Sequence, residues 1–230
     1  QAVDRVGGML GLPFPAGKFL EELALQSDAS FKIRPSMKGA DCSLSGVENQ
    51  CRKMLDHGSP QEDVARYCLL SILAALDGMA AAGKTTAAAL LCEAFGGACV
   101  HMDDFFLPPA LRTPQRLSQP GGNVHYERFA EEVAPALHLG RALCYGVFDC
   151  SRMTLAGTRS VPAAPLIIVE GAYSLHPFFS RELYDVRAYY SVSPEVQRAR
   201  ILARNGPAAL SAFEEKWIPM ENAYAAAFGI

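Results

Sequence analysis

The chain has 230 residues, half of them hydrophobic and a fifth charged, with a net charge of −3 and a pI near 6. This composition is typical of a folded globular protein and excludes a disordered one. The balance of charge gives no basic surface for nucleic acid, so we expect no nucleic-acid partner. No run approaches about 18 apolar residues, and no basic stretch followed by an apolar block lies near the start. We therefore expect no membrane span, no signal peptide and a cytoplasmic location.

Cysteine and histidine patterns exclude several kinds of site. The seven cysteines are odd in number, scattered and without a C-x-x-C pair, which indicates neither a disulfide framework nor a zinc site and favours reduced thiols. His57, His138 and His176 have no neighbours at metal-ligand spacing, and no Ser/His/Asp arrangement is present. Hydrolase chemistry therefore has no support.

Residues 1–70 have the pattern of short helices separated by loops. Helical apolar spacing covers Lys18–Leu25 and Val47–Leu55, and Pro60 with the acids that follow it starts a helix through Val64–Leu70. No strand is evident there. From about residue 71, short apolar runs alternate with helical stretches, which indicates βαβ units and a parallel sheet. We expect a helical N-terminal segment at 1–70 and an α/β domain at 71–230.

The α/β region contains clear strand and helix signals. Leu166–Val169 is an unbroken apolar run, as expected for a central strand buried on both faces. Ser193, Pro194 and Glu195 start a helix that runs to Asn205 and is closed by Gly206. The proline-rich stretch 107–123 resists regular structure and is typical of a lid or binding loop. The other expected strands are Ile72–Leu76, Ala98–Met102 and Ala188–Val192.

Residues 78–85 read Gly-Met-Ala-Ala-Ala-Gly-Lys-Thr and fit the pattern G-x-x-x-x-G-K-[ST]. In this loop, backbone N–H groups surround phosphates, the lysine reaches the β- and γ-phosphates, and the hydroxyl holds magnesium. A strand precedes it, and the Ala/Leu-rich helix Thr85–Phe95 follows, with an N-terminal dipole that favours anions. The alternative is a glycine-bounded turn that caps an ordinary helix. The residues expected to bind the nucleotide are Gly78, Met79, Ala80, Ala81, Ala82, Gly83, Lys84, Thr85 and Thr86.

Acidic residues follow two of the expected strands. Asp103 and Asp104 come after the second strand, at the sheet edge where ligands of open α/β sheets bind. One such carboxylate can accept the proton of a substrate hydroxyl in phosphoryl transfer. Glu170 ends the apolar strand, and an acid so placed fits a magnesium site together with Thr85. Solvated acids at a turn and at a strand end are the alternatives.

Basic residues offer further candidates. Arg200 and Arg204 share one face of the helix from Pro194 and could close over the transferring phosphoryl group, although a solvated helical face explains them as well. Arg112 and Arg116 stand in the proline-rich loop and could meet an anionic substrate or nucleotide. Trp217 is more consistent with packing of a C-terminal helix than with stacking on a base.

From Ile72 onward, motifs occur in the order GxxxxGKTT, HMDDFFLPP, GGNVHYERF, YGVFDC, LIIVEGAYSLHP and QRARILARNG…WIPMENAY. This order resembles the bacterial uridine kinase-like branch of the P-loop nucleoside kinases, whose relatives include nicotinamide riboside kinases and phosphoribulokinase. The resemblance implies a P-loop NTPase three-layer sandwich with a parallel sheet, of the nucleoside or NMP kinase type. It also implies ATP and Mg²⁺ as cofactors and transfer of the γ-phosphate to a hydroxyl.

The resemblance implies roles for individual residues. Lys84 and Thr85 would act on phosphate and magnesium, and Asp103 as base, with Glu170 on the magnesium side and Arg200 or Arg204 in a lid. His125 stands where that family usually has an Asp that contacts the sugar, and a neutral imidazole cannot accept two hydroxyl bonds as a carboxylate can. The expected substrate-binding residues are Asp104, Phe105, His125, Tyr126 and Arg128.

The first 70 residues resemble a different family. The segments Asp4–Val6, Leu10–Gly17 and Lys38–Gly46 look like a piece of the sialoglycoprotease-like, ASKHA-type ATPases that make threonylcarbamoyladenosine in tRNA. The paired-histidine metal motif and the nucleotide-binding halves of that family are absent, so we expect no activity from this fragment.

The sequence thus predicts an ATP-dependent small-molecule kinase, with a nucleoside as first choice of acceptor. A small-molecule substrate is the expected partner, and a homo-oligomer is left open. Two other functions remain as alternatives. One is a P-loop switch without an acceptor, and the other is a tRNA-modification factor that acts through its N-terminal segment.

Overall fold

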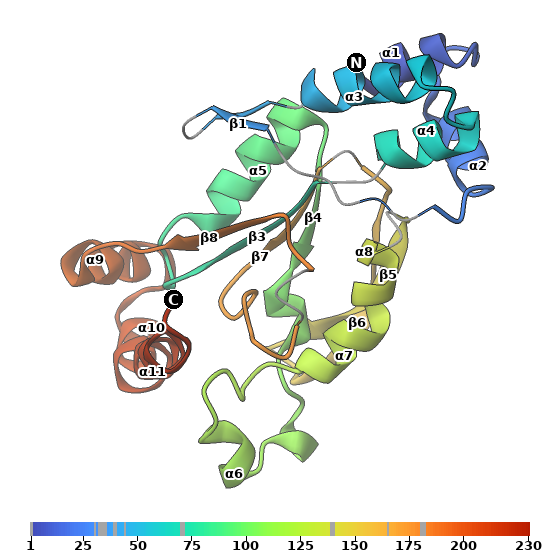
Figure 1. The fold of residues 1–230 in the computed structure, drawn as a ribbon. Helices are drawn as coiled ribbons and strands as arrows, with labels where there is room; N and C mark the ends of the chain where they lie inside the picture. Colours follow the sequence, from blue (N-terminus) through green and yellow to red (C-terminus); the bar gives the residue numbers. More distant parts are fainter. Residues whose placement is uncertain are drawn as a thin grey trace.

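The structure is a computed structural model, shown in Figure 1. The residues that it describes are 2–29, 31, 36–38, 41–43, 45–69, 72–138, 141–164, 166–179 and 183–230.

A parallel four-stranded sheet lies at the centre of the α/β region, in the order β4-β7-β3-β8. The strands are β3 (Ile72–Gly78), β4 (Ala98–His101), β7 (Leu166–Glu170) and β8 (Val186–Tyr190). All four were predicted, but β8 begins two residues earlier than expected and β3 continues through Asp77 and Gly78. The side chains of β7 are buried along its whole length, as expected of an inner strand covered on both faces.

Helices cover both faces of the sheet, which gives three layers (Figure 1). Helix α5 (Lys84–Phe95) packs Ala88 and Leu91 onto one face, against Leu76 and Ile168. The opposite face carries alternate residues of the same strands and a larger core that includes Tyr224. That core is built with α7 (Tyr126–Glu132), α8 (Ala134–His138) and the hairpin of β5 (Leu143–Asp149) and β6 (Thr154–Val161).

The hairpin was not predicted. Its two strands pair in antiparallel fashion around a turn at residues 150–153, where Met153 has a φ of 55°. Most residues of β6 are exposed, so the strand lacks the apolar alternation that marks a half-buried strand in sequence. The stretch 107–123, expected to be irregular, contains the short helices η2 (Pro109–Leu111) and α6 (Pro114–Leu117), and η1 (Met102–Phe105) precedes it.

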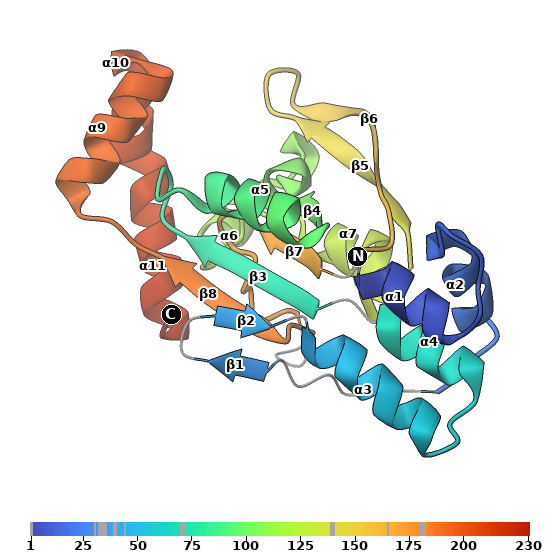
Figure 2. The same cartoon turned by 90° about the horizontal axis from the view of Figure 1, so that it is seen from above.

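Helices at the C-terminal end of the sequence gather beyond the carboxyl end of β3 (Figures 1 and 2). Helix α9 (Pro194–Asn205) has the predicted bounds, and the Ser193 hydroxyl accepts the N–H of Val196 at 3.4 Å as its cap. It is followed by α10 (Pro207–Ala212), the π-helical turn η3 (Phe213–Trp217) and α11 (Ile218–Phe228).

The N-terminal helices lie at the other end of the sheet (Figures 1 and 2). They are α1 (Ala2–Met9), α2 (Gly17–Ala24), α3 (Ser45–Asp56) and α4 (Gln61–Leu69). Among the described residues they share a small core of their own, centred on Val6, Leu20 and Val64. A short antiparallel pair, β1 (Ser36–Lys38) and β2 (Asp41–Ser43), corrects the expectation of no strand in this region. Leu70, the last residue of the expected third helix, lies outside the described residues.

Helix length and hydropathy bear on the expectation of no membrane span. None of the helices in the described parts of the chain combines the length and apolarity that a membrane crossing needs.

Candidate active site

The loop between β3 and α5 has a backbone that its two glycines permit. Gly78 has a φ of 136°, and a Cβ placed there would lie 2.1 Å from the carbonyl oxygen of Tyr190 on β8. Gly83, immediately before α5, has a φ of 100°. Both conformations are strained for any residue with a side chain. Ala81 also has a positive φ, of 58°, which costs an alanine free energy that the surrounding contacts must offset.

Lys84 folds back under this loop. Its Nζ donates to the carbonyl oxygens of Gly78 and Met79, both at 2.8 Å, and the side chain is buried. An ammonium group has three protons, so one remains for a further acceptor such as a phosphate oxygen. Burial lowers the pKa of Lys84, and the negative charge of Glu221 opposes that shift.

Thr85 and Glu170, the two expected magnesium ligands, are in direct contact. The Thr85 hydroxyl donates to Glu170 Oε2 at 2.9 Å, and Glu170 Oε1 lies 2.6 Å from His101 Nδ1. This contact arises because Glu170 points to the same face of the sheet as α5, at whose first turn Thr85 stands. The Glu170 side chain is buried, with 6% of its surface accessible. A buried carboxylate and a hydroxyl in contact are hard oxygen donors of the kind that Mg²⁺ prefers.

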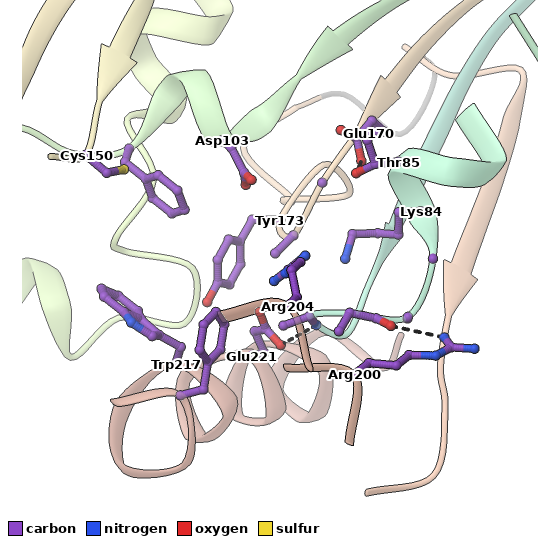
Figure 3. Close-up of a pocket in the computed structure, with 18 of the residues that line it drawn as sticks. Lys84, Thr85, Asp103, Cys150, Glu170, Tyr173, Arg200, Arg204, Trp217 and Glu221 are labelled. Atoms are coloured by element: carbon purple, nitrogen blue, oxygen red, sulfur yellow. Dashed lines mark hydrogen bonds between the residues drawn. The ribbon is translucent and has the colours of Figure 1, made fainter. Parts of the chain in front are cut away.

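Asp103 faces the loop from the other side of a cavity of about 830 Å³ (Figure 3). The Asp103 side chain is exposed through the cavity. Partial desolvation by the protein atoms around its carboxylate, together with the negative charge of Glu170, raises the pKa of Asp103, and Lys84 opposes the shift. A carboxylate with a raised pKa is a stronger base than an ordinary one.

The cavity is lined by residues from five parts of the chain, as Figure 3 shows for most of them. The loop and α5 contribute 80–87 and Leu90; the segment after β4 contributes Asp103, Phe106, Arg112 and Asn123; the β5–β6 turn contributes Cys150 and Met153; the end of β7 and the segment after it contribute Glu170, Gly171, Ala172 and Tyr173; and the C-terminal helices contribute Arg200, Arg204, Phe213, Trp217 and Glu221.

Helices α9 and α11 fix the middle of the loop. Glu221 Oε2 accepts the N–H of Ala80 at 2.8 Å, and Gln197 Nε2 donates to the Ala80 carbonyl oxygen at 3.1 Å. Arg200 Nη1 donates to the carbonyl oxygen of Ala81 at 3.1 Å. We call these three contacts the loop clamp. Of the two lid candidates, Arg200 thus belongs to the clamp, whereas Arg204 lines the cavity and donates to Asn205.

The carboxylate of Asp77, directly before the loop, also holds the loop in place through hydrogen bonds. Its buried carboxylate accepts the N–H groups of Gly78, Tyr173 and Leu175 and the Tyr224 hydroxyl, at 2.6 to 2.9 Å. The carboxylate therefore ties the end of β3 to the segment after β7 and to α11. A buried carboxylate needs such a set of donors to offset its desolvation.

None of the five expected substrate residues is among those that line this cavity, so their role in binding a substrate stays a prediction. Phe105 is fully buried, in contact with the Phe129 and Tyr145 rings, and Arg128 donates to carbonyl oxygens of Gly146 and of residue 104.

Two of the remaining three expected substrate residues have side-chain partners. The Asp104 carboxylate accepts the Tyr145 hydroxyl and pairs with Arg159. Tyr126 stacks on His176, whereas His125 stands at the N-cap position of α7 and its side chain makes no capping hydrogen bond. Periodicity and spacing could not separate these residues from Asp103, because all follow strands or begin helices near the same sheet edge.

Several cavity residues were missed by the sequence reasoning. Tyr173 and Glu221 lie within segments that carry the resemblance but were given no role, and Cys150 and Met153 belong to the unpredicted turn. Trp217 was expected to pack a helix, but it lines the cavity. The acid at 221, in an otherwise apolar helix, was the one local signal that could have indicated a buried partner.

Comparisons with known proteins add to this picture. No family model matches the chain. A bifunctional tRNA threonylcarbamoyladenosine biosynthesis protein, by its name, of Thermoplasma volcanium is 33% identical over 63 residues, which are 27% of this chain and 12% of that protein. It belongs to the family with which residues 1–70 were compared. Because the match spans so little of that relative, its activity is not carried over.

Two solved structures are similar to the α/β fold. A protein named as a fructose transport system kinase from a Silicibacter species has a TM-score of 0.54 at 22% identity, over 78% of this chain and 94% of that one. A protein named as a uridine kinase from Bacillus stearothermophilus has a TM-score of 0.45 at 18% identity, over 75% and 92%. The predicted P-loop α/β sandwich, with its parallel sheet, is confirmed.

Proposed function

We propose that this protein transfers the γ-phosphoryl group of ATP to a hydroxyl of a small molecule, with a nucleoside as first candidate. One arrangement carries the proposal: Asp103 faces Lys84 across the cavity, with Thr85 and Glu170 beside the lysine (Figure 3). A phosphate-binding loop alone would support binding. A carboxylate on the opposite side supports transfer to an acceptor.

The donor would bind at the loop. The N–H groups at the start of α5 and the free proton of Lys84 Nζ can donate hydrogen bonds to phosphate oxygens. Thr85 and Glu170 would hold magnesium, which in phosphoryl transfer neutralises the charge that develops on the phosphate oxygens. Two protein oxygens suffice for this ion, because Mg²⁺ usually keeps several of its waters.

The acceptor would bind between Asp103 and the loop. Its hydroxyl proton passes to an Asp103 carboxylate oxygen while the hydroxyl oxygen forms a bond to the γ-phosphorus. The bond from that phosphorus to the bridging oxygen breaks, and ADP leaves. Lys84, at the loop, stabilises the charge on the transferring group.

A comparison of wild type with Asp103→Asn tests this function. We expect acceptor-dependent ADP release from wild type, across a panel of nucleosides, sugars and pantothenate, to fall by about 10²–10⁴-fold in the variant. Asp56→Asn, an exposed site on α3, serves as the matched control and should behave as wild type. Equal, acceptor-independent ATP hydrolysis in all three proteins would favour a P-loop switch instead.

A further inference from the structure

The cavity has two ends of different chemistry. Figure 3 shows Lys84 and Thr85 at one end and Cys150 and Trp217 at the other, with Asp103 and Tyr173 between them. If the nucleotide phosphates occupy the loop end, as proposed above, the acceptor must extend toward Cys150 and Trp217. What lines that end therefore selects the acceptor.

The acceptor end is largely apolar but contains one guanidinium group. Phe106, Met153, Phe213 and Trp217 provide apolar and aromatic surface. Arg112 lines the same cavity, and its Nε lies 2.6 Å from the carbonyl oxygen of Leu107, next to Phe106, in the segment after β4 that also supplies Asp103. Of the other cavity cations, Lys84 lies beneath the loop, Arg200 donates to the loop, and Arg204 lies on α9 and donates to Asn205.

The guanidinium of Arg112 is held by a hydrogen bond to the backbone, but among the described residues no acid forms an ion pair with it. Its Nε donates to the carbonyl oxygen of Leu107 at 2.6 Å, which fixes the guanidinium plane. Within the described part of the chain, its Nη groups form no hydrogen bond and no ion pair. Its neighbour in the same loop, Arg116, differs: it binds both carboxylate oxygens of Glu127, at 2.6 and 2.8 Å. A partly buried guanidinium with a free edge is suited to a carboxylate or phosphate.

A second polar group in the cavity also lacks a partner. Asn123 is 3% exposed, and its Oδ1 has no hydrogen-bond partner among the described residues. A buried amide oxygen left unsatisfied costs free energy, which a hydrogen bond from a bound ligand would offset. The cavity therefore contains two unsatisfied groups besides the loop, one cationic and one polar.

We propose that the phosphate acceptor carries an anionic group, which Arg112 binds at the end of the cavity away from the loop. The body of the acceptor packs against the apolar surface of Trp217 and Met153, and its hydroxyl reaches Asp103. This inference rests on the proposed kinase function and replaces its first candidate acceptor, a neutral nucleoside, with a hydroxylated carboxylate or phosphate.

Cys150 offers a test of the anion site that needs no turnover. Its thiolate attacks the methylene carbon of iodoacetate or of iodoacetamide, an S–C bond forms, and iodide leaves. Both rates at one cysteine are proportional to the same fraction of thiolate, so this fraction cancels in their ratio. The ratio therefore reports whether the surroundings of that cysteine favour the anionic iodoacetate over the neutral iodoacetamide. Cys144, which is also exposed, is an internal control read by mass spectrometry of the same digest.

Asp103, Asp149 and Asp104 also act on Cys150 and oppose Arg112, so the test compares variants at the same cysteine. We expect the iodoacetate-to-iodoacetamide ratio at Cys150 to fall by about 5- to 10-fold in Arg112→Ala, since the loss of one charge near a reacting thiolate has an effect on this order. The ratio should be kept in Arg112→Lys and in Arg152→Ala, and the ratio at Cys144 should not change in any variant. A ratio at Cys150 that is unchanged in Arg112→Ala would overturn the anion site whether or not the protein is a kinase.

Matched acceptors then test the substrate class. Pantothenate and its uncharged alcohol panthenol, and gluconate and glucitol, differ mainly in one carboxylate. We expect kcat/KM to be at least tenfold higher for the anionic member of a productive pair, and the KM of that member to rise about 10- to 100-fold in Arg112→Ala. If a neutral member has the same kcat/KM as its anionic partner, the proposal of an anionic acceptor is wrong. If no acceptor is phosphorylated, that result would count against the proposed function, while the alkylation ratio would still show whether Arg112 binds an anion.

Discussion

The carboxyl group of Glu221 should make the stability of this protein depend on pH near neutrality. The group is buried between α11 and the loop, where it accepts the Ala80 N–H. Burial raises the pKa of Glu221 from its ordinary 4.5 to about 7, although the Lys84 charge opposes the shift. At about 1.4 kcal/mol per pH unit, this difference corresponds to about 3 kcal/mol.

The direction in which stability changes with pH follows from the number of protons bound by the folded and the unfolded state. The unfolded chain loses this proton near pH 4.5 and the folded protein near pH 7, so the folded state binds more protons in between. The contribution of Glu221 to the free energy of unfolding therefore falls as pH rises through this window and is constant above it. Glu221→Gln keeps an oxygen for the Ala80 N–H but cannot ionise. We expect the variant to exceed wild type in stability by up to about 3 kcal/mol at pH 8, and by under about 1 kcal/mol at pH 5.

Urea unfolding at pH 5, 6, 7 and 8 measures this difference. Trp217 is the single tryptophan of the chain and lines the same cavity, so its fluorescence reports the relevant region. Glu93→Gln, an exposed acid on α5, is the matched control and should shift stability equally little at every pH. If the difference between Glu221→Gln and wild type is the same at pH 5 and pH 8, the reasoning about burial is wrong.

Three further predictions concern the loop and its supports. Lys84→Met should lower turnover by about 10²–10³-fold with an unchanged far-UV circular dichroism spectrum, and activity near that of wild type would mean that the loop does not bind phosphate. Asp77→Ala should reduce the free energy of unfolding by about 3–5 kcal/mol in urea titrations, because three N–H groups and the Tyr224 hydroxyl lose their acceptor. A loss below about 1 kcal/mol would contradict that account. Glu170→Gln should raise the Mg²⁺ concentration needed for half-maximal activity by about tenfold or more, whereas an unchanged requirement would place the ion elsewhere.

The parts of the fold that the sequence predicted are those with local causes. The cap at Ser193 and the closing Gly206 gave α9 its correct bounds, and the apolar run before Glu170 identified the inner strand β7. The loop from Gly78 to Thr85 was evident because its chemistry demands fixed residue types at fixed spacing.

The parts of the fold and of the candidate site that were not predicted depend on contacts between distant residues, which leave no local pattern in the sequence. Arg128 looked like a substrate residue, yet it ties α7 to the hairpin. Glu221 gave little signal, yet it binds the loop from 141 residues away. The turn that supplies Cys150 to the cavity belongs to a hairpin with one exposed strand, and such strands have weak patterning.

The loop clamp also bears on the order in which the protein becomes functional during synthesis. The Ala80 contacts to Gln197 and Glu221 span 117 and 141 residues, so a ribosome must complete most of the chain before they can form. A nascent chain that has emerged only through α5 carries the phosphate-binding sequence but not the groups that hold its strained Ala81 backbone. Competence to bind nucleotide would then arise late and in one step, when the final helices dock.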